Sequence, residues 1–325
     1  MMQKGIFTIS LDFELFWGVR DHRTLVDYGK NIRNVHEVIP RLLQLFQKYN
    51  VHCTWATVGF LFFNNKEELQ ADFPASLPEY EKPEYDPYNY IRQNELEPLF
   101  HFALPLIEKI KNTPGQEICT HTFSHFYALE KNTTINQFSA DLKAALKGAS
   151  KNDIKLTSIV FPRNQYSDAH IIACRESGIQ VYRGNEESGA YSPVSRENEN
   201  IFRRALRFAD GYLNLTGHHC HKLPEYSEII NVPASRFLRP FNPGLKVLNR
   251  IKLRRIMKSI QYAATHGLIY QLWWHPHNFG SYTDENFIFL EKILIEYSRL
   301  NHLQKMESLN LQEIYSRTRQ NNEKI

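Results

Sequence analysis

Four apolar stretches of this 325-residue chain each end in polar side chains that can do chemistry. They are FTISLDFE with Asp12 and Glu14, EICTHTFSH with His121 and His125, IVFPR with Arg163, and IYQLWWH with His275. Two imidazoles and one carboxylate can hold a divalent cation, a second carboxylate can act as a base, and a separate histidine can act as an acid. The set predicts a metal-assisted hydrolase.

Asp12 and Glu14 lie two residues apart, a spacing that places both side chains on one face of a strand. Two carboxylates on one face of an apolar strand repel each other and lose hydration unless a cation stands between them. The alternative is that one carboxylate caps a turn while the other is solvated. The strongly apolar flanks favour the cation.

His121 and His125 form an HxxxH pair directly after a predicted strand. If the chain turns helically there, residues four apart are neighbours and both rings can reach one ion. Two histidines and one carboxylate, with coordination positions left open, are typical of a catalytic rather than a structural metal site. Such a site suits Zn²⁺, and Fe²⁺, Co²⁺ or Mn²⁺ can also occupy it.

Arg163 and His275 complete the set. Arg163 either pairs with a neighbouring carboxylate, lowering its pKa and fixing its rotamer, or is an ordinary surface arginine. His275 closes an apolar run, and Pro276 forces the chain out of regular structure immediately afterwards. His277 follows two residues later, and spacing alone does not decide which of the two histidines points inward.

The elements that must position these residues alternate between strands and helices. We expect strands at 5–11 and 51–59 and in the segments QEICTH, LTSIVFP and IQVYRG, and helices near 34–48, 95–112, 136–150 and 167–177. This alternation predicts a parallel α/β fold with the chemistry at the carboxyl ends of the strands. We expect one domain over 1–325, with long excursions at 64–95, which can cover the site, and at 184–200.

Composition excludes several classes of protein. With 42% hydrophobic and 23% charged residues the chain folds, and its net charge of +4 does not indicate binding to nucleic acid. The four cysteines are widely spaced, which favours buried free thiols over a disulfide framework. A strand begins almost at the first residue, and no apolar run approaches the ~18 residues of a membrane span. We therefore expect a cytoplasmic protein.

Two further segments have alternative interpretations. Residues 245–264 combine a leucine and isoleucine stripe with a lysine- and arginine-rich face. They form either a surface helix packed on the barrel or a helix that lies on the inner face of a membrane with anionic lipids. The histidine-rich GHHCH at 217–221 is expected to be a solvated loop rather than a metal site. No GxSxG, GxGxxG or P-loop motif is present, which counts against serine hydrolases and nucleotide chemistry.

The motifs resemble those of the polysaccharide deacetylases, the NodB-homology or carbohydrate esterase family 4 group. SLDFE resembles the first motif, with one residue between its acids, and EICTHTFSH the second. FPRNQY resembles the third with altered proline–arginine order, WWHP resembles the last, and the fourth is not recognisable. The resemblance spans residues 5–280 and implies a distorted (β/α) barrel of about seven strands.

The resemblance also implies roles. Asp12 would be the general base, Glu14, His121 and His125 the metal ligands, Arg163 the residue that orients the base, and His275 the general acid. Glu14 stands where aspartate is usual, and no acid is identified that tunes His275. The implied reaction removes an N-acyl, typically N-acetyl, group from an amino sugar of a polysaccharide or lipid-linked saccharide. The alternatives are a cyclic-amide hydrolase on the same barrel and an inactive saccharide-binding protein.

Overall fold

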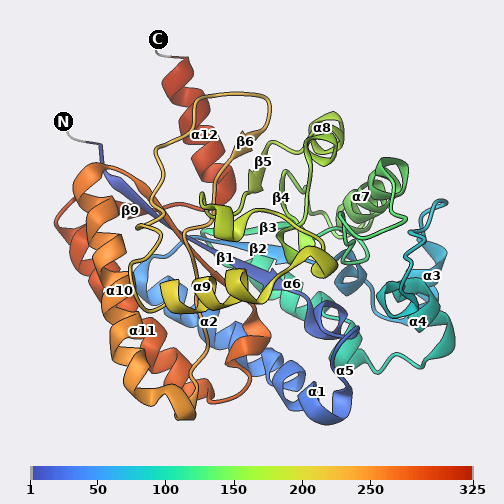
Figure 1. Cartoon of the computed structure of the whole chain (residues 1–325). Helices are drawn as coiled ribbons and strands as arrows, with labels where there is room; N and C mark the ends of the chain where they lie inside the picture. Colours follow the sequence, from blue (N-terminus) through green and yellow to red (C-terminus); the bar gives the residue numbers. More distant parts are fainter. Residues whose placement is uncertain (1–2, 324–325) are drawn as a thin grey trace.

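Strand β1 (Gly5–Phe13) lies inside a parallel sheet in the computed structural model, which describes residues 3–323 (Figure 1). All nine of its residues are buried, as expected for a parallel strand covered on both faces. It pairs with β2 (Cys53–Thr57) on one side and with β8 (Ile269–Trp274) on the other. The short strand β9 (Met306–Ser308) pairs with the beginning of β1.

The sheet curls into a distorted barrel. Beyond β2 follow β3 (Gln116–Thr120), β4 (Ser158–Val160), β5 (Val181–Arg183) and β6 (Ile230–Asn231), and beyond β8 follows β7 (Arg236–Phe237). β6 and β7 belong to one short segment, in which the Val232 N–H donates to Tyr182 of β5 and the Leu238 N–H to Trp273 of β8. Counted once, this segment closes a ring of seven strands in the described part of the chain, with β9 outside it. The predicted barrel is confirmed.

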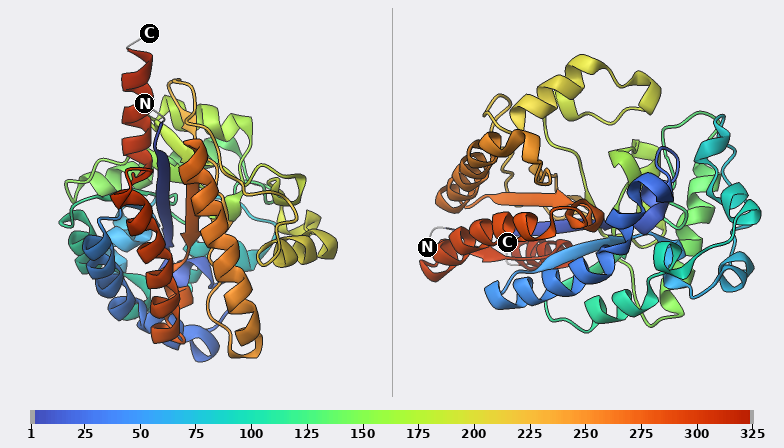
Figure 2. Two further views of the ribbon diagram at one scale, coloured as in Figure 1. Left: turned by 90° about the vertical axis from the view of Figure 1, so that its left-hand side faces the viewer. Right: turned by 90° about the horizontal axis from the view of Figure 1, so that it is seen from below.

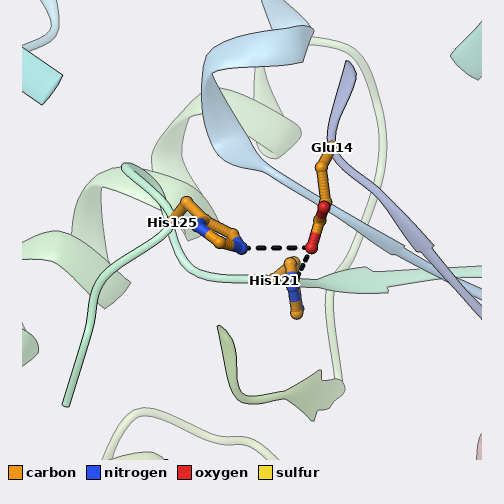
Figure 3. Close-up of side chains that lie close together, drawn as sticks. All are labelled: Glu14, His121 and His125. Carbon is orange, nitrogen blue, oxygen red and sulfur yellow. Dashed lines mark hydrogen bonds and ion pairs between the residues drawn. The ribbon is translucent and has the colours of Figure 1, made fainter. Parts of the chain in front are cut away.

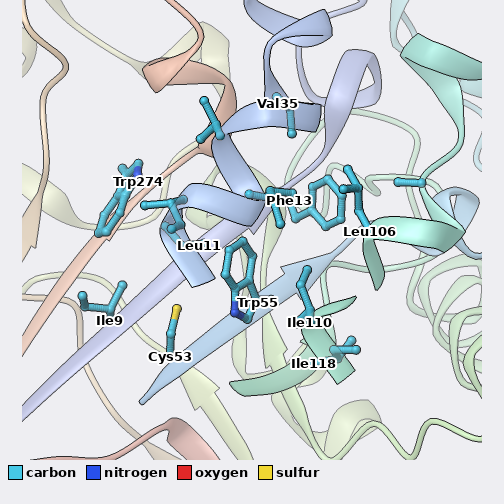
Figure 4. Packing of buried hydrophobic residues seen from close by; sticks show 14 of the residues in the cluster. Ile9, Leu11, Phe13, Val35, Cys53, Trp55, Leu106, Ile110, Ile118 and Trp274 are labelled. Carbon is cyan, nitrogen blue, oxygen red and sulfur yellow. The ribbon is translucent and has the colours of Figure 1, made fainter. Parts of the chain in front are cut away.

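Helices cover the outside of the ring. They are α1 (Leu25–Arg33), α2 (Val35–Tyr49), α6 (Leu104–Lys111), α7 (Ile135–Ser150), α8 (Asp168–Glu176), α10 (Lys246–His266), α11 (Thr283–His302) and α12 (Leu311–Asn322). Helix α2 buries Val38, Ile39, Leu42 and Phe46, a spacing that forms one helical face. Figure 4 shows side chains of β1, β2 and β8 packed among residues from these helices. Full burial of one such side chain stabilises the fold by about 1.5–3 kcal/mol.

The helix expected over 95–112 is divided into α5 (Pro98–His101) and α6. Each piece carries a proline, Pro98 or Pro105, in its first turn, where the missing N–H costs no hydrogen bond; further along a helix it would. The excursion at 64–95 is also more regular than its sequence indicates. It holds α3 (Lys66–Ala71) and α4 (Pro87–Gln93), which begin at the capping side chains of Asn65 and Asp86.

Residues 184–200 form the expected loop with two single 3-10 turns, and a helix that the sequence analysis missed follows it. This helix, α9 (Ile201–Asp210), stands out from the body of the molecule (Figure 2). Its pattern escaped detection because most of its apolar side chains face outward rather than toward a core.

The helix expected at 245–264 is α10, and it packs against α11 and β1. Its buried face includes Ile256 and Ile260, together with Lys252 and Arg255. Two residues of the basic face expected from the sequence therefore lie inside, which supports the packed surface helix. Among residues 3–323 no helix has the length and apolar character needed to cross a bilayer. All four cysteines are free, and Cys53, Cys119 and Cys174 are buried as expected.

Candidate metal centre and its surroundings

Glu14, His121 and His125 converge at the carboxyl ends of the strands (Figure 3). Phe13 of β1 lies opposite Thr57 of β2, which lies opposite Thr120 of β3, so the residues that follow, Glu14 and His121, emerge at one level. Glu14 Oε1 is 3.1 Å from His121 Nε2 and 3.1 Å from His125 Nε2. All three side chains are buried. The convergence expected from the sequence is confirmed.

The protonation of these groups fits a bound cation. His121 Nδ1–H donates to the backbone oxygen of Val160 at 2.7 Å, so in the neutral ring the Nε2 lone pair faces Glu14. Burial lowers the pKa of His125, and its Nδ1 has no partner. Burial alone would raise the pKa of Glu14, but the neighbouring imidazoles, which also hydrogen-bond to it, hold that pKa well below its usual range. A carboxylate oxygen 3.1 Å from the Nε2 atoms of two imidazoles suits a divalent ion between them.

The loop that carries the two histidines is not helical, so the helical turn expected there is wrong. Thr122 and His125 instead adopt left-handed backbone conformations, with φ of 62° and 60°. Such conformations are costly for residues other than glycine, and they cluster at functional sites. They bring the second ring back beside the first, which a strand would not do.

Asp141 on α7 holds this loop in place. Its carboxylate accepts hydrogen bonds from the Phe123 N–H at 2.7 Å, the Ser124 N–H at 3.1 Å and the Ser124 hydroxyl. Burial raises the pKa of Asp141 to about 6. The sequence analysis missed this residue, although an aspartate on the buried face of an amphipathic helix, beside Phe138 and Leu142, is a visible signal.

Asp12 is paired with Arg183, which ends β5. The two guanidinium nitrogens of Arg183 donate to the two carboxylate oxygens at 2.6 and 2.9 Å, and both side chains are buried. Burial acts to raise the pKa of Asp12, but the charge of Arg183 lowers it below the ordinary value. The guanidinium carbon also lies 4.4 Å from the centre of the Trp273 ring. Asp12 is therefore ionised and held in one orientation.

Arg163 does not contact Asp12, so the role expected for it is wrong. Its guanidinium pairs with Asp21 and with Glu130 at 3.3 Å, and it lies over the Tyr127 ring at 3.6 Å. After β4 the chain enters a turn at Pro162, and Arg163 takes a left-handed conformation (φ 55°) that directs it away. Arg183 ends the IQVYRG run, the same kind of signal that drew attention to Arg163.

His275 follows Trp274, which lies opposite Leu11, so His275 stands beside Asp12. Its Nε2 is 3.8 Å from Asp12 Oδ2 and 3.6 Å from Glu14 Oε1. His277 is buried behind it, and burial lowers its pKa to about 3. The structure thus directs His275 toward the carboxylates. Its Nδ1 lies 3.3 Å from the amide oxygen of Asn278, not near an acid.

A cavity of about 300 Å³ opens beside His275. Trp273 and Phe237 line it near the histidine, and Tyr191, Arg207 and Arg239 line it elsewhere. The side chains of Asp12, Glu14 and the two paired histidines are buried and are not part of its lining. His275 therefore stands between the buried acids and the space open to a ligand.

The excursion at 64–95 borders the metal centre through tyrosines that are buried or partly buried. The Tyr80 hydroxyl accepts from the Tyr127 N–H at 2.9 Å, and Tyr85 packs edge-on against Tyr127. The Tyr127 ring in turn contacts His125, with 5.3 Å between ring centres. Tyr88 is fully buried against Phe60 and Phe73. These tyrosines fasten the excursion to the barrel.

The GHHCH segment is not solvated, contrary to the expectation. His219 and His221 are buried, and the backbone of His221 exchanges hydrogen bonds with Ile269 of β8. His219 Nε2 lies 2.6 Å from the Thr216 hydroxyl, and the His218 ring stacks on Tyr262. The histidines of this segment therefore serve packing between β8 and α10.

No family model matches the sequence, and no curated protein matches it either. Solved structures do. A Mycobacterium smegmatis protein assigned to the polysaccharide deacetylases matches with a TM-score of 0.60 at 11% identity, over 98% of this chain and 92% of its own. A GH57-type branching enzyme from Pyrococcus horikoshii matches with a TM-score of 0.54 at 12% identity, over 96% and 70% of the two chains. Puue allantoinase matches with a TM-score of 0.53 at 10% identity, over 96% and 88%. The chain has the NodB-like α/β fold of the first of these structures.

Proposed function

We propose that this protein is a metal-dependent hydrolase that removes an N-acyl group, in the simplest case N-acetyl, from an amino sugar of a polysaccharide or lipid-linked saccharide. The observation that carries the proposal is the position of Glu14 Oε1, 3.1 Å from the Nε2 atoms of both His121 and His125. Asp12 and His275 stand beside this group, as a base and an acid for hydrolysis would.

Glu14, His121 and His125 would hold the cation, with Zn²⁺ the first candidate and Fe²⁺, Co²⁺ or Mn²⁺ the others. When bound, the cation supplies Lewis-acid chemistry, polarising the acyl carbonyl and acidifying water. The hydrogen bond from His121 to Val160 fixes the tautomer that leaves Nε2 free to ligate.

Two side chains move protons in this proposal. Asp12, kept ionised and oriented by Arg183, accepts a proton from the attacking water. His275, at the edge of the cavity, gives a proton to the leaving amine. One water molecule is consumed, the C–N bond breaks, and a carboxylate and an amine are formed. Arg183 does not move a proton and is a positioning residue.

The cavity supports a saccharide as the substrate. Trp273 and Phe237 offer aromatic faces beside His275, and Tyr191 lines the same cavity with polar groups such as Asn164 and Asn185. An apolar wall with a few converging polar groups is typical of small-molecule sites, and about 300 Å³ lies at the lower end of their range.

The test is acetate release from a panel of N-acetylated amino sugars and their oligomers, using purified protein. We expect activity that disappears with a chelator and returns with Zn²⁺. Glu14→Gln should lose the metal measured by elemental analysis, whereas Glu225→Gln, at an exposed position, should keep it. Full activity in metal-free protein would reject the role of the centre.

Assays on the same purified protein distinguish the two alternatives, a cyclic-amide hydrolase and an inactive saccharide-binding protein. A cyclic-amide hydrolase would open cyclic amides and release no acetate from any sugar. A binding protein would retain saccharides without turnover even when loaded with metal. The presence of both Asp12 and His275, 3.8 Å apart, favours an enzyme over a binding protein.

A further inference from the structure

The cavity beside His275 extends to three arginines. Arg207 of α9, Arg236 of β7 and Arg239 just beyond β7 all line it. None of them takes part in the hydrolysis proposed above. They come from elements about 30 residues apart in the chain, which hydrogen bonds from Arg239 to Arg207 and from Arg236 to Asp210 join, so their charges meet only in the folded state.

The arginines outnumber the acids that could neutralise them. Asp210 pairs with Arg236 and lies 3.9 Å from Arg255, and Glu199 pairs with Arg207 at 2.6 Å. Arg239 has no carboxylate partner within residues 3–323, and its guanidinium donates to the backbone oxygen of Arg207. Burial lowers the pKa of Arg239, and the charges of Arg207 and Arg236 lower it further. Glu186 is a third carboxylate at the cavity and forms no ion pair with Arg239, so among the described residues Arg239 is left without an acidic partner, which an anion would supply.

Arg236 also has unused donors. Its side chain is only 4% exposed, yet Nε and Nη2 have no hydrogen-bond partner in the described structure. Nearly all buried N–H groups in proteins are paired, so Arg236 keeps unmet hydrogen-bonding capacity at the wall of the cavity that it lines.

We propose that Arg207, Arg236 and Arg239 form an anion subsite that takes a phosphate or diphosphate group carried by the saccharide. Guanidinium groups match phosphate oxygens in pairs, and three of them exceed what a single carboxylate would use. The subsite lies in the same cavity as His275, so one ligand can present its amino sugar to the acid and its phosphate to the arginines. The link to a saccharide depends on the proposed function, whereas anion binding does not.

The experiment is a calorimetric titration of pyrophosphate into the whole protein at physiological salt. We expect one site per chain, weakened roughly 10- to 100-fold in Arg239→Gln, because a charged hydrogen bond is worth about 1.5–3 kcal/mol. Arg239→Lys should recover part of the affinity. Arg254→Gln, an exposed position on α10, is the matched control and should bind as the wild type does.

Equal pyrophosphate binding by Arg239→Gln and the wild type, or no binding by either, would overturn the subsite. Pyrophosphate binding that survives in a protein with no deacetylase activity would reject the proposed function while keeping the subsite. Competition by uridine diphosphate and by farnesyl diphosphate distinguishes the sources: the tighter competitor identifies a nucleotide-linked or a lipid-linked saccharide.

A second inference starts from the outer face of α9. Ile201 and Phe202 are 74% and 81% exposed, and Leu206 and Phe208 on the same helix are also exposed. Arg203 turns inward and donates to the backbone oxygens of Ala190 and Ser192. The usual arrangement of a surface helix is therefore reversed, on an element that stands out from the body (Figure 2).

The charge of the surrounding residues indicates which kind of surface the exposed apolar face of α9 binds. Residues 200–283 contain 12 lysines and arginines but only three acids, whereas the whole chain is nearly balanced at 39 to 35. Exposed Arg204 lies on α9 itself, and exposed Arg250, Arg254 and Lys258 on α10 add to the positive field. Apolar side chains surrounded by basic ones are typical of helices that lie in the head-group region of anionic membranes.

We infer that α9 docks on an anionic lipid surface. A stable protein interface needs roughly 800 Å² from each partner, more than a projecting ten-residue helix is suited to supply, whereas insertion into lipid needs no complementary surface. The basic residues of α10 attract the anionic lipid but do not insert into it. The inserting helix is therefore α9, and not the segment 245–264 for which the sequence analysis considered a membrane contact. Lys252 and Arg255 of that helix are buried and cannot take part.

Co-sedimentation with phosphatidylglycerol vesicles tests this inference, and phosphatidylcholine vesicles should bind much more weakly. The double variant Ile201→Ser, Phe202→Ser should lose binding roughly 10-fold or more, since each buried apolar side chain contributes about 1.5–3 kcal/mol. Val26→Ser, at a 98% exposed position on α1, is the control. Unchanged binding by the double variant, or a dimer that this variant breaks, would overturn the membrane contact.

Discussion

At the carboxyl ends of β1 and β3, two carboxylates meet three imidazole rings and one arginine, whereas in the cavity beside α9 three arginines gather and one of them, Arg239, has no acidic partner in the described part of the chain. The first region presents lone pairs to a cation, and the second presents N–H donors to an anion. His275 lies where the two regions meet, since it contacts both acids of the first and lines the cavity of the second.

The regions also differ in how they are built. The first stands on strand ends whose register places Glu14 and His121 at one level, with Asp12 two residues earlier in β1, within a fully buried core. The second depends on a helix held by side-chain bonds such as Arg207 to Glu199. We infer that the first region sets the chemistry and the second sets which ligand is held.

The sharpest division between the regions is kinetic. Asp12→Asn should lower kcat by about 10²–10⁴, the usual contribution of a general base. Arg239→Gln should instead raise KM for a phosphate-linked substrate with little change in kcat, because it removes binding common to ground and transition states. Steady-state kinetics on both variants checks this. A large loss of kcat in Arg239→Gln would show that the arginine cluster takes part in the chemical step as well as in binding.

The two arginines at the strand tips should differ in stability. Arg183→Met leaves Asp12 buried with only His275, at 3.8 Å, beside it, so we expect about 3–5 kcal/mol lower free energy of unfolding. Arg163→Met should cost less, because the side chain is 19% exposed and Asp21 keeps Arg196 as a second partner. Urea denaturation measures both, and equal losses would show that Arg163 carries a buried pair after all.

Two buried aspartates should respond to pH in opposite directions. The pKa of Asp141 is raised to about 6, so its contribution to stability is fully present below its unfolded value near 3.8 and is lost as pH rises through 6. That difference amounts to about 3 kcal/mol. The pKa of Asp210 is lowered to about 2, so its contribution is present above 3.8 and lost as pH falls through 2.

Unfolding free energies of the wild type, Asp141→Asn and Asp210→Asn between pH 3 and 7 test this pair. On acidification from pH 7 to 4, the free energy of unfolding of the wild type should increase relative to that of Asp141→Asn. Below pH 4, the free energy of unfolding of the wild type should decrease relative to that of Asp210→Asn. A gap for Asp141→Asn that does not change with pH would show that this carboxyl titrates normally.

The smallest expected effect concerns Glu199. Glu199→Gln removes the partner of Arg207 and leaves the cavity more positive. Pyrophosphate should then bind about fivefold more tightly, since a partly exposed ion pair is worth at most ~1 kcal/mol. Titration calorimetry gives the change, with Glu225→Gln as control, and weaker binding would mean that Glu199 positions the arginine rather than neutralising it.

Much of the barrel follows from local pattern. The strands that carry the site were predicted because apolar runs such as IFTISL and IYQLWW end abruptly in polar residues, and the helices between them have a clear period. The division of 95–112 into two helices and the helix α9 were not predicted. The single helix expected over 95–112 is divided because Pro98 and Pro105 each begin a helix. Helix α9 was missed because its apolar residues face solvent, so its sequence lacks the pattern of a helix that packs on a core.

What the sequence by itself determined is the inventory at the strand tips: Asp12, Glu14, His121, His125 and His275 are recognisable because each polar type interrupts an apolar run at a fixed place. What only the tertiary structure decided is which of them meet. Arg163 and Arg183 end similar apolar runs. The left-handed backbone conformation of Arg163, which the sequence does not reveal, turns it away, and Arg183 pairs with Asp12 instead. The arginine cluster likewise exists only because a long loop returns α9 to the open side of the barrel, and no local pattern encodes contacts between residues so distant in the chain.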